Sequence, residues 1–100
     1  MSMSTLTFLV NHLVERPTEI HDHEWDTLVA QEREIATERV RRGVLAGLWR
    51  VPGRTANWGL WRVCSAEELH ELLTSLPLAP WSTFDVHLLA RHPLMEPEDT

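Results

Sequence analysis

The spacing of hydrophobic and polar positions changes along the chain, and each change marks a new element. Residues 5–14, TLTFLVNHLV, are rich in apolar and β-branched residues that partly alternate, which predicts a strand. Pro17 then marks a loop. Residues 22–42 place apolar side chains at steps of three and four, which predicts a helix. Asp22 is its expected cap and Gly43 its stop.

The second half of the chain repeats the strand and helix patterns. The turn PGR joins two strand-like stretches into a hairpin, and PLAP breaks the helix that follows it. Ser65 and Glu68 form an S-x-x-E capping box at the start of that helix. The predicted elements are strands over 44–51, 55–63 and 82–92 and a helix over 65–76.

The order βαββαβ predicts a ferredoxin-like α+β fold, a four-stranded antiparallel sheet with both helices on one face. One domain is expected over 1–93, followed by an acidic tail over 94–100. The strand 55–63 is apolar on both parities, with Trp58 on one face and Trp61 on the other. A sheet that is apolar on both faces needs a partner, so a homo-oligomer is expected.

Composition narrows the class of protein. The net charge of −6 argues against nucleic acid, whose phosphates require a basic surface. No apolar run is long enough to span a membrane, and the N-terminus has no basic region typical of a signal peptide, so a cytoplasmic protein is expected. The single cysteine, Cys64, excludes an internal disulfide and is expected to be a buried thiol. Five tryptophans exceed the needs of one small core, so some should face an interface or a ligand cavity.

Glu32 interrupts the apolar side of the predicted helix 22–42. It shares that side with Leu28, Val29, Ile35 and Ala36. A carboxylate there is costly unless it is paired, and desolvation would raise its pKa. This is the environment of a general base that works near neutral pH. The alternative is a structural ion pair with Arg50 or Arg62 from the sheet.

A second group of polar residues lies in LWRVPGRTANWG, residues 48–59. Arg50 and Arg54 could hold the carboxylate of a substrate through paired hydrogen bonds. Thr55 and Asn57 are neutral polar groups suited to a lactone or enolate oxygen. The alternative is an ordinary hairpin with exposed arginines.

The remaining motifs point away from metals and cofactors. His21 and His23 lie beside two carboxylates, but the His-x-His spacing directs the rings apart and no third ligand is evident, so no metal site is expected. The chain has no G-x-G-x-x-G, P-loop, G-x-S-x-G or H-E-x-x-H motif. Acid–base chemistry without a cofactor is therefore favoured.

Several segments together resemble the muconolactone delta-isomerase family. They are LWRVPGRTANWGLWRV, LHELLTSLPLAPW and ARHPL, which are similar to the family's L-W-R strand, its G-x-Y-A-N turn, its L-H-x-x-L helix ending in L-P-L-x-P, and its R-H-P. The segment AQEREIA matches the family pattern A-x-E-x-E-x-A. The similarity covers roughly residues 28–93.

The resemblance implies a fold, an assembly and a reaction. The family has the ferredoxin-like fold, assembles into decamers with active sites between subunits, and needs no metal or organic cofactor. Its members shift a double bond in a small unsaturated lactone acid by moving a proton with one glutamate, which matches Glu32. A related branch eliminates chloride from a chlorinated muconolactone.

Two positions depart from the family pattern. The tyrosine of G-x-Y-A-N is Thr55 here, and Gly47 stands where histidine commonly precedes L-W-R. Both substitutions replace a large polar side chain with a small one, so a wider pocket with fewer hydrogen bonds is expected. That expectation favours a different, bulkier substrate.

The leading hypothesis is a cofactor-independent isomerase with Glu32 as its base, acting on a small lactone or carboxylate substrate. Residue type assigns Arg50 to the carboxylate, Thr55 and Asn57 to the dienolate oxygen, and Trp49 and Trp58 to the cavity walls. Three alternatives remain open: elimination or cyclisation on another substrate, cofactor-free oxidation of aromatic polyketides, and a non-catalytic ligand-binding or assembly protein.

Overall fold

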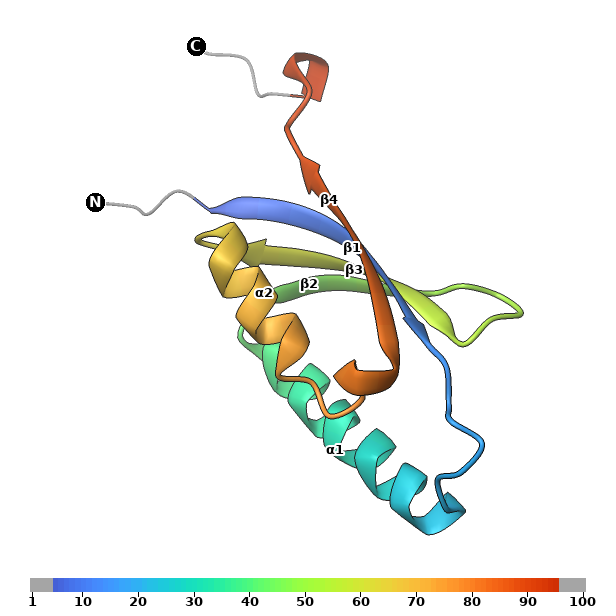
Figure 1. The fold of residues 1–100 in the computed structure, drawn as a ribbon. Helices are drawn as coiled ribbons and strands as arrows, with labels where there is room; N and C mark the ends of the chain where they lie inside the picture. Colours follow the sequence, from blue (N-terminus) through green and yellow to red (C-terminus); the bar gives the residue numbers. More distant parts are fainter. Residues whose placement is uncertain (1–4, 96–100) are drawn as a thin grey trace.

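The computed structural model describes residues 5–95 and has the predicted order of elements (Figure 1). Two short 3-10 helices, η1 and η2, accompany the six main elements. In chain order, all the elements including the two 3-10 helices are β1 Leu6–Val14, α1 Asp22–Arg41, β2 Leu45–Arg50, β3 Ala56–Val63, α2 Ala66–Thr74, η1 Ala79–Trp81, β4 Ser82–Leu89 and η2 Pro93–Met95.

The strands form one antiparallel sheet in the order β2-β3-β1-β4. Both α-helices lie on the same face of this sheet (Figure 1). The arrangement confirms the ferredoxin-like α+β prediction. No helix within the described residues is long and apolar enough to cross a membrane.

The start of α1 differs from the prediction. His21 is its N-cap and makes no side-chain cap hydrogen bond, whereas Asp22 is the first helical residue. The Asp22 carboxylate pairs instead with Arg16 in the preceding loop. As the first helical residue Asp22 is not the cap, but its charge lies in the first turn, where the helix dipole favours it.

The last strand also ends earlier than predicted. β4 stops at Leu89, which pairs with Thr7 close to the start of β1. Among residues 5–95, no strand pairs with the chain beyond Leu89, and Pro93 opens the turn of η2. Of the predicted tail, residues 96–100 lie outside the described range.

The predicted capping box of α2 is present in a slightly altered form. The Ser65 hydroxyl accepts the Glu68 N–H at 3.0 Å, as expected. The Glu68 carboxylate accepts the N–H of Cys64 at 2.7 Å instead of the N–H of the cap itself. Cys64 is exposed, so the expectation of a buried thiol is wrong: the chain leaves the sheet after buried Val63 and turns outward.

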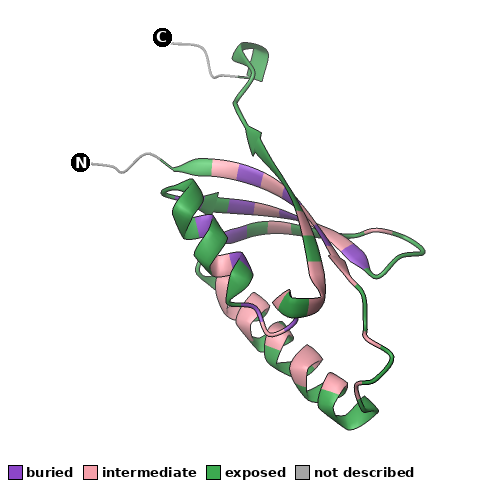
Figure 2. Ribbon diagram, in the orientation of Figure 1, coloured by how far each residue is buried: buried purple, intermediate pink, exposed green. Residues whose placement is uncertain are grey.

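The core lies between the sheet and the helices, and its buried residues come from the sheet, from α2 and from the loop after α2 (Figure 2). Residues of α1 are at most half-buried, and none is fully buried. A 20-residue helix with no buried side chain has packed only part of its apolar side. The buried cluster comprises Phe8, Val10, Leu45, Trp61, Val63, Leu69, Leu73 and Leu76.

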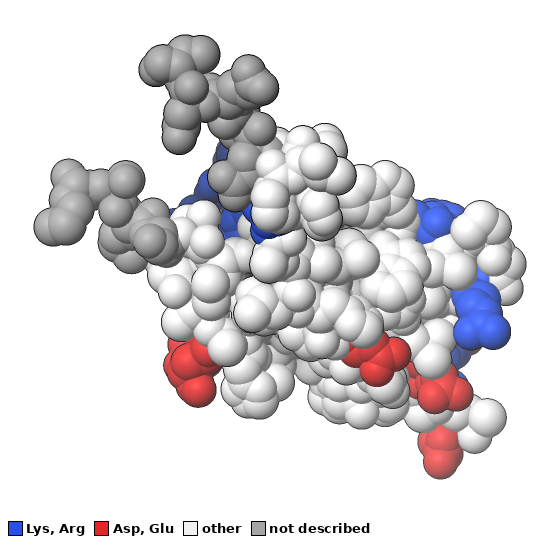
Figure 3. Space-filling model, turned by 90° about the horizontal axis from the view of Figure 1, so that it is seen from above, with Lys and Arg blue, Asp and Glu red and all other residues white. Residues whose placement is uncertain are grey.

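Apolar surface also remains on both faces of the sheet. Val86 and Leu88 of β4 pair with the buried residues Val10 and Phe8, yet Leu88 is 61% exposed because neither α1 nor α2 covers the end of β4. On the other face, Trp49 is 54% exposed. From the side opposite α1, charged side chains border a wide uncharged centre (Figure 3).

Two glycines in the sheet each adjoin a tryptophan two residues later. A Cβ on Gly59 would lie 2.8 Å from the indole nitrogen of Trp61, which is 6% exposed. A Cβ on Gly47 would lie 2.6 Å from the indole of exposed Trp49. Gly59 therefore makes room for a core side chain and Gly47 for a surface side chain.

Substitution by alanine should destabilise the protein by different amounts at the two glycines. Gly59→Ala should lower the free energy of unfolding by about 1–3 kcal/mol, because the Trp61 indole cannot move aside within the core. Gly47→Ala should cost less, since exposed Trp49 can rotate away. Urea denaturation of both variants at one protein concentration measures the difference. Equal costs would mean that Trp49 is held as firmly as Trp61.

Candidate active site

The register of the strands places a row of polar side chains on the helix-facing side of the sheet. Asn57 of β3 pairs with His12 of β1 on one side and with Arg50 of β2 on the other, and His12 pairs in turn with Phe84 of β4. Directly paired residues of antiparallel strands share a face. Val10 and Gly59 belong to the neighbouring row, which is apolar. The polar row therefore borders the core.

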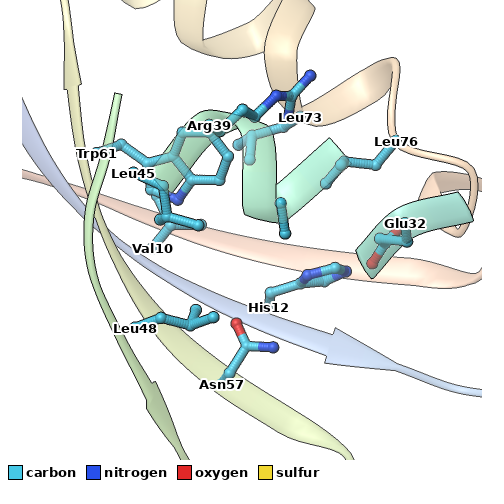
Figure 4. Close-up of a pocket in the computed structure, with 11 residues that line it drawn as sticks. Val10, His12, Glu32, Arg39, Leu45, Leu48, Asn57, Trp61, Leu73 and Leu76 are labelled. Atoms are coloured by element: carbon cyan, nitrogen blue, oxygen red, sulfur yellow. The ribbon is translucent and has the colours of Figure 1, made fainter. Parts of the chain in front are cut away.

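A cavity of about 60 Å³ lies over this boundary, between α1, α2 and the sheet (Figure 4). Its polar lining consists of Glu32, Arg39, His12 and Asn57, and the rest is apolar. The Glu32 carboxylate and the His12 ring point toward each other across it, from α1 and β1. Ligand pockets usually hold about 300–1,000 Å³, so a single chain encloses only part of such a site. The apolar lining residues are Val10, Ala36, Leu45, Leu48, Trp61, Leu73 and Leu76.

Glu32 lies where the helical spacing in the sequence predicted. It lies on the side of α1 that faces the sheet, near Ala36, and is half-buried. Its Oε1 atom accepts the backbone N–H of Leu78 at 2.9 Å, from the loop between α2 and β4. Desolvation raises the pKa of Glu32, while the Leu78 N–H and the charge of Arg39 act in the opposite direction.

Glu32 has no ion-pair partner among residues 5–95. The salt bridges in that range join Arg16 to Asp22 and Arg41 to Glu38. The proposed structural ion pair of Glu32 with Arg50 or Arg62 is therefore absent from the described part of the chain. Arg62 pairs with Thr7 on the sheet face opposite the helices, which puts it out of reach.

His12 is a further polar group of the cavity. It is only 9% exposed, and its ring stacks on Phe84 with a centroid separation of 4.5 Å. Its Nε2 lies 2.7 Å from the hydroxyl oxygen of Ser82. Burial lowers the pKa of His12 to about 4, so the imidazole is neutral at neutral pH.

Arg39 brings the only guanidinium among the lining residues. It lies seven residues after Glu32 on α1, about two turns along the same side. Its guanidinium donates to the Leu72 carbonyl at 2.9 Å and lies 5.6 Å from the centre of the Trp61 ring. These contacts join α1 to α2 and hold a positive charge at the edge of the cavity.

Of the predicted substrate-binding residues, Asn57 lines the cavity. Its side chain points into the cavity from β3, beside Leu48 (Figure 4). Arg50 shares the polar row with Asn57 but is exposed and does not line the cavity. In a single chain it therefore lies at the margin of the site.

The other predicted binding residues lie elsewhere in the chain. Trp49 and Trp58 pair with each other on the sheet face opposite the helices, so neither can line the cavity of its own chain. The Thr55 hydroxyl donates to the Val14 carbonyl at 2.8 Å. Gly47 does not widen this cavity either, since the space beside it is taken by the Trp49 indole on that opposite face.

Metal chemistry finds no support in the described residues. Within 5–95, no three histidine, cysteine or carboxylate side chains lie close enough to hold an ion. His21 is the N-cap of α1 and His23 lies in its first turn, both exposed. The cavity polar groups are instead one carboxylate, one neutral imidazole, one amide and one guanidinium.

The positions of His12 and Arg39 in the chain pointed to the cavity, although their residue types alone did not. His12 has the parity of the core residues Phe8 and Val10, so it had to face the helices. Arg39 lies at a helical spacing from Glu32 that returns to the same side. The Leu78 N–H, a backbone donor in a loop, had no such signal.

The geometry suits proton transfer at carbon. A carboxylate with a raised pKa lies over a largely apolar cavity, and one of its oxygens is held by a backbone donor. Asn57 can donate from its amide to an oxygen that gains charge, and Arg39 can attract an anion. The arrangement lacks a serine or cysteine nucleophile among the lining residues.

Comparison with known proteins identifies the family. The family model for muconolactone delta-isomerase matches residues 6–94. The muconolactone delta-isomerase of Pseudomonas aeruginosa is 36% identical over 88 residues, which are 88% of this chain and 92% of that protein. That of Rhodococcus opacus is 33% identical over 85 residues, 85% of this chain and 91% of the other.

The fold agrees with these sequence matches. A crystal structure of muconolactone isomerase superposes with a TM-score of 0.85 at 35% identity, covering 94% of this chain and 99% of that chain. The sequence match and the structural match thus extend over nearly the same residues. The chain belongs to the muconolactone delta-isomerase family, a family of isomerases.

Proposed function

We propose that the protein is a cofactor-independent isomerase that shifts a double bond in a small unsaturated lactone acid, with Glu32 as its base. The observation that carries the proposal is the environment of Glu32, a half-buried carboxylate bound by the Leu78 N–H and facing a cavity. The names of the relatives supply the substrate class, since they are muconolactone delta-isomerases.

The reaction requires one proton and no net change in oxidation. Glu32 takes a proton from a carbon conjugated with the lactone carbonyl, and the electron pair of that C–H bond moves into a dienolate. The protonated Glu32 then returns the proton to another carbon of the conjugated system. Desolvation favours the first step, because a carboxylate with a raised pKa is a stronger base.

Asn57 is the proposed donor to the dienolate oxygen, because its amide lies in the cavity and carries no competing charge. Thr55 loses that role within its own chain, since its hydroxyl donates to the carbonyl of Val14 in β1. Arg50 remains the proposed partner of the substrate carboxylate, at the exposed end of the polar row. Arg39 is the competing candidate.

Glu32→Gln tests the base directly. The amide keeps the size of the side chain but cannot take a proton, so the rate should fall by about 10²–10⁴-fold. Proton NMR of muconolactone in D2O follows both isomerisation and exchange. Glu34→Gln, an exposed substitution two residues along α1, is the control and should retain full activity.

Two other results would change the assignment. Exchange of deuterium without isomerisation would keep Glu32 as a base and reject muconolactone as the substrate; release of chloride or water from an alternative substrate would then indicate elimination. A Glu32→Gln protein that is as active as wild type would reject the base.

Arg50→Met tests the carboxylate contact. Losing a charge-assisted hydrogen bond costs about 1.5–3 kcal/mol, so KM should rise about tenfold or more while kcat changes little. Arg54→Met, an exposed arginine in the adjacent turn, is the matched control. An unchanged KM in Arg50→Met removes the role from Arg50, and a raised KM in Arg39→Met would transfer it to Arg39.

We also propose that the active molecule is a homo-oligomer whose sites lie between subunits, a decamer by analogy with the family. Three observations support it: the small cavity of one chain, the absence of fully buried residues in α1, and the exposure of Leu88 over the core. In such an assembly, exposed Trp49 is available to close the cavity of a neighbouring subunit.

Sedimentation velocity tests the assembly. The protein should sediment with a mass several times the 11.6 kDa of the chain. Leu88→Arg should reduce that mass, because a charge replaces an apolar side chain at a surface that would be buried. Thr83→Arg, on the same strand but the opposite face, is the comparison. A monomer for the unaltered protein would reject the proposal.

A further inference from the structure

Three hydrogen bonds connect β1 to Glu32 through the loop between α2 and β4. Nε2 of His12 lies 2.7 Å from the Ser82 hydroxyl oxygen. That hydroxyl donates to the carbonyl of Leu78 at 2.7 Å, and the N–H of Leu78 donates to Oε1 of Glu32 at 2.9 Å. Leu78 is thus held through both of its backbone polar groups, one toward Ser82 and one toward Glu32.

The direction of the first bond follows from counting hydrogens. A serine hydroxyl has one hydrogen, and Ser82 gives it to Leu78. His12 must therefore donate from Nε2, which leaves Nδ1 without a hydrogen in the neutral ring. The pKa of His12, lowered to about 4 by burial, agrees with a neutral imidazole at neutral pH.

Stacking and burial hold the His12 ring in place. It stacks on Phe84 and is almost completely buried. The Leu78 carbonyl also accepts the N–H of Trp81 at 3.0 Å, within the turn of η1. The Trp81 bond closes the turn locally, whereas the Ser82 bond ties the turn to the β1–β4 pair. The second bond is the one that sets the position of Leu78 relative to the sheet.

The second carboxylate oxygen of Glu32 remains available. Oε2 has no hydrogen-bond partner among residues 5–95, and no fully buried side-chain oxygen or nitrogen in that range lacks a partner. Oε2 therefore keeps access to the cavity or to solvent. One oxygen is held and the other is free, which is the arrangement that a base needs.

We propose that His12 and Ser82 are positioning residues for Glu32. They hold the Leu78 N–H against one carboxylate oxygen, which directs the other oxygen toward the substrate. This inference rests on the proposed role of Glu32 as the base. It adds two residues, 70 positions apart in the sequence, that act on Glu32 through the backbone of Leu78.

The effect on Glu32 has a definite sign. The Leu78 N–H favours the ionised carboxylate, so loosening that bond should raise the pKa of Glu32 above its value in the unaltered protein. The other ionisable groups at the cavity are Arg39 on α1 and His12 on β1. The lining residues from β2, β3 and α2 are apolar or, in Asn57, a neutral amide, so they do not titrate.

The test is a carboxyl titration of the unliganded protein by carbon-13 NMR, with the Glu32 signal identified by its loss in Glu32→Gln. Ser82→Ala and His12→Asn should both raise the pKa of Glu32, since each removes a link of the chain. His12→Gln should stay near the unaltered value, because its amide nitrogen can reach the Nε2 position. Thr83→Ala, on the opposite face of β4, is the control.

A double variant and a rate measurement complete the test. His12→Asn combined with Ser82→Ala should shift the pKa no further than either change alone, because both break the same chain. With muconolactone as substrate, Ser82→Ala should lower kcat about tenfold with little change in KM. A structural defect alone would lower the melting temperature without moving the Glu32 pKa.

Two results would overturn the proposal. One is an unchanged Glu32 pKa in Ser82→Ala, and the other is a shift in His12→Gln as large as that in His12→Asn. The titration needs no substrate, so it is independent of the reaction. A shifted pKa in a protein that leaves muconolactone unchanged would uphold the positioning role and reject only the proposed substrate.

Discussion

The hydrogen bond between the Leu78 N–H and Glu32 constrains how the helices and the sheet are arranged. A carboxylate withdrawn from water needs donors, and a backbone amide supplies one without neutralising the charge as a nearby guanidinium would. Desolvation still leaves the pKa of Glu32 raised. This hydrogen bond also requires the Leu78 N–H, in the loop after α2, to lie 2.9 Å from Oε1 of Glu32 on α1, so both helices must share one face of the sheet. The βαββαβ order meets this requirement, because both crossovers pass over the same side.

The strand register determines which side chains of the sheet line the cavity. Each strand contributes one residue to a row, and the polar row containing His12 and Asn57 adjoins an apolar row. Gly59 in the apolar row leaves space for the Trp61 indole to lie over β3. The cavity is therefore partly polar and partly apolar for a geometric reason. A lactone acid, with a carboxylate, a carbonyl and an apolar ring edge, has a comparable division of character.

Local patterns were sufficient for the fold and for Glu32. Helical spacing placed the carboxylate on the sheet side of α1, because a three-to-four residue period depends only on neighbours in the chain. Alternation in strands also contained information that residue type obscured. Asn57 and Trp58 are adjacent, so they must point to opposite faces and cannot line the same cavity. The same reasoning separates Trp49 from Arg50. The assignment of both tryptophans to the cavity ignored that rule.

Such local patterns do not predict contacts between residues that are far apart in the sequence. The contact between His12 and Ser82 depends on how β1 and β4 align, and on a loop that follows a different helix. Neither residue carries a motif, and the donor to Glu32 is a main-chain N–H that any residue except proline provides. The exposure of apolar side chains on β4 likewise depends on the assembled sheet. By its position in the strand Leu88 resembles a core residue, but the helices do not extend over it.

The bond at Leu78 has a thermodynamic consequence for the loop itself. If the closed loop makes Glu32 a stronger acid, then ionised Glu32 must by reciprocity make the closed loop more stable. When the Glu32 carboxyl group is protonated, its hold on Leu78 weakens, and the segment from Leu78 to Ser82 becomes easier to displace. The charge state of Glu32 and the stability of the loop are thus coupled. In the proposed reaction, each proton that Glu32 accepts would loosen the loop, and each proton that it returns would tighten the loop again.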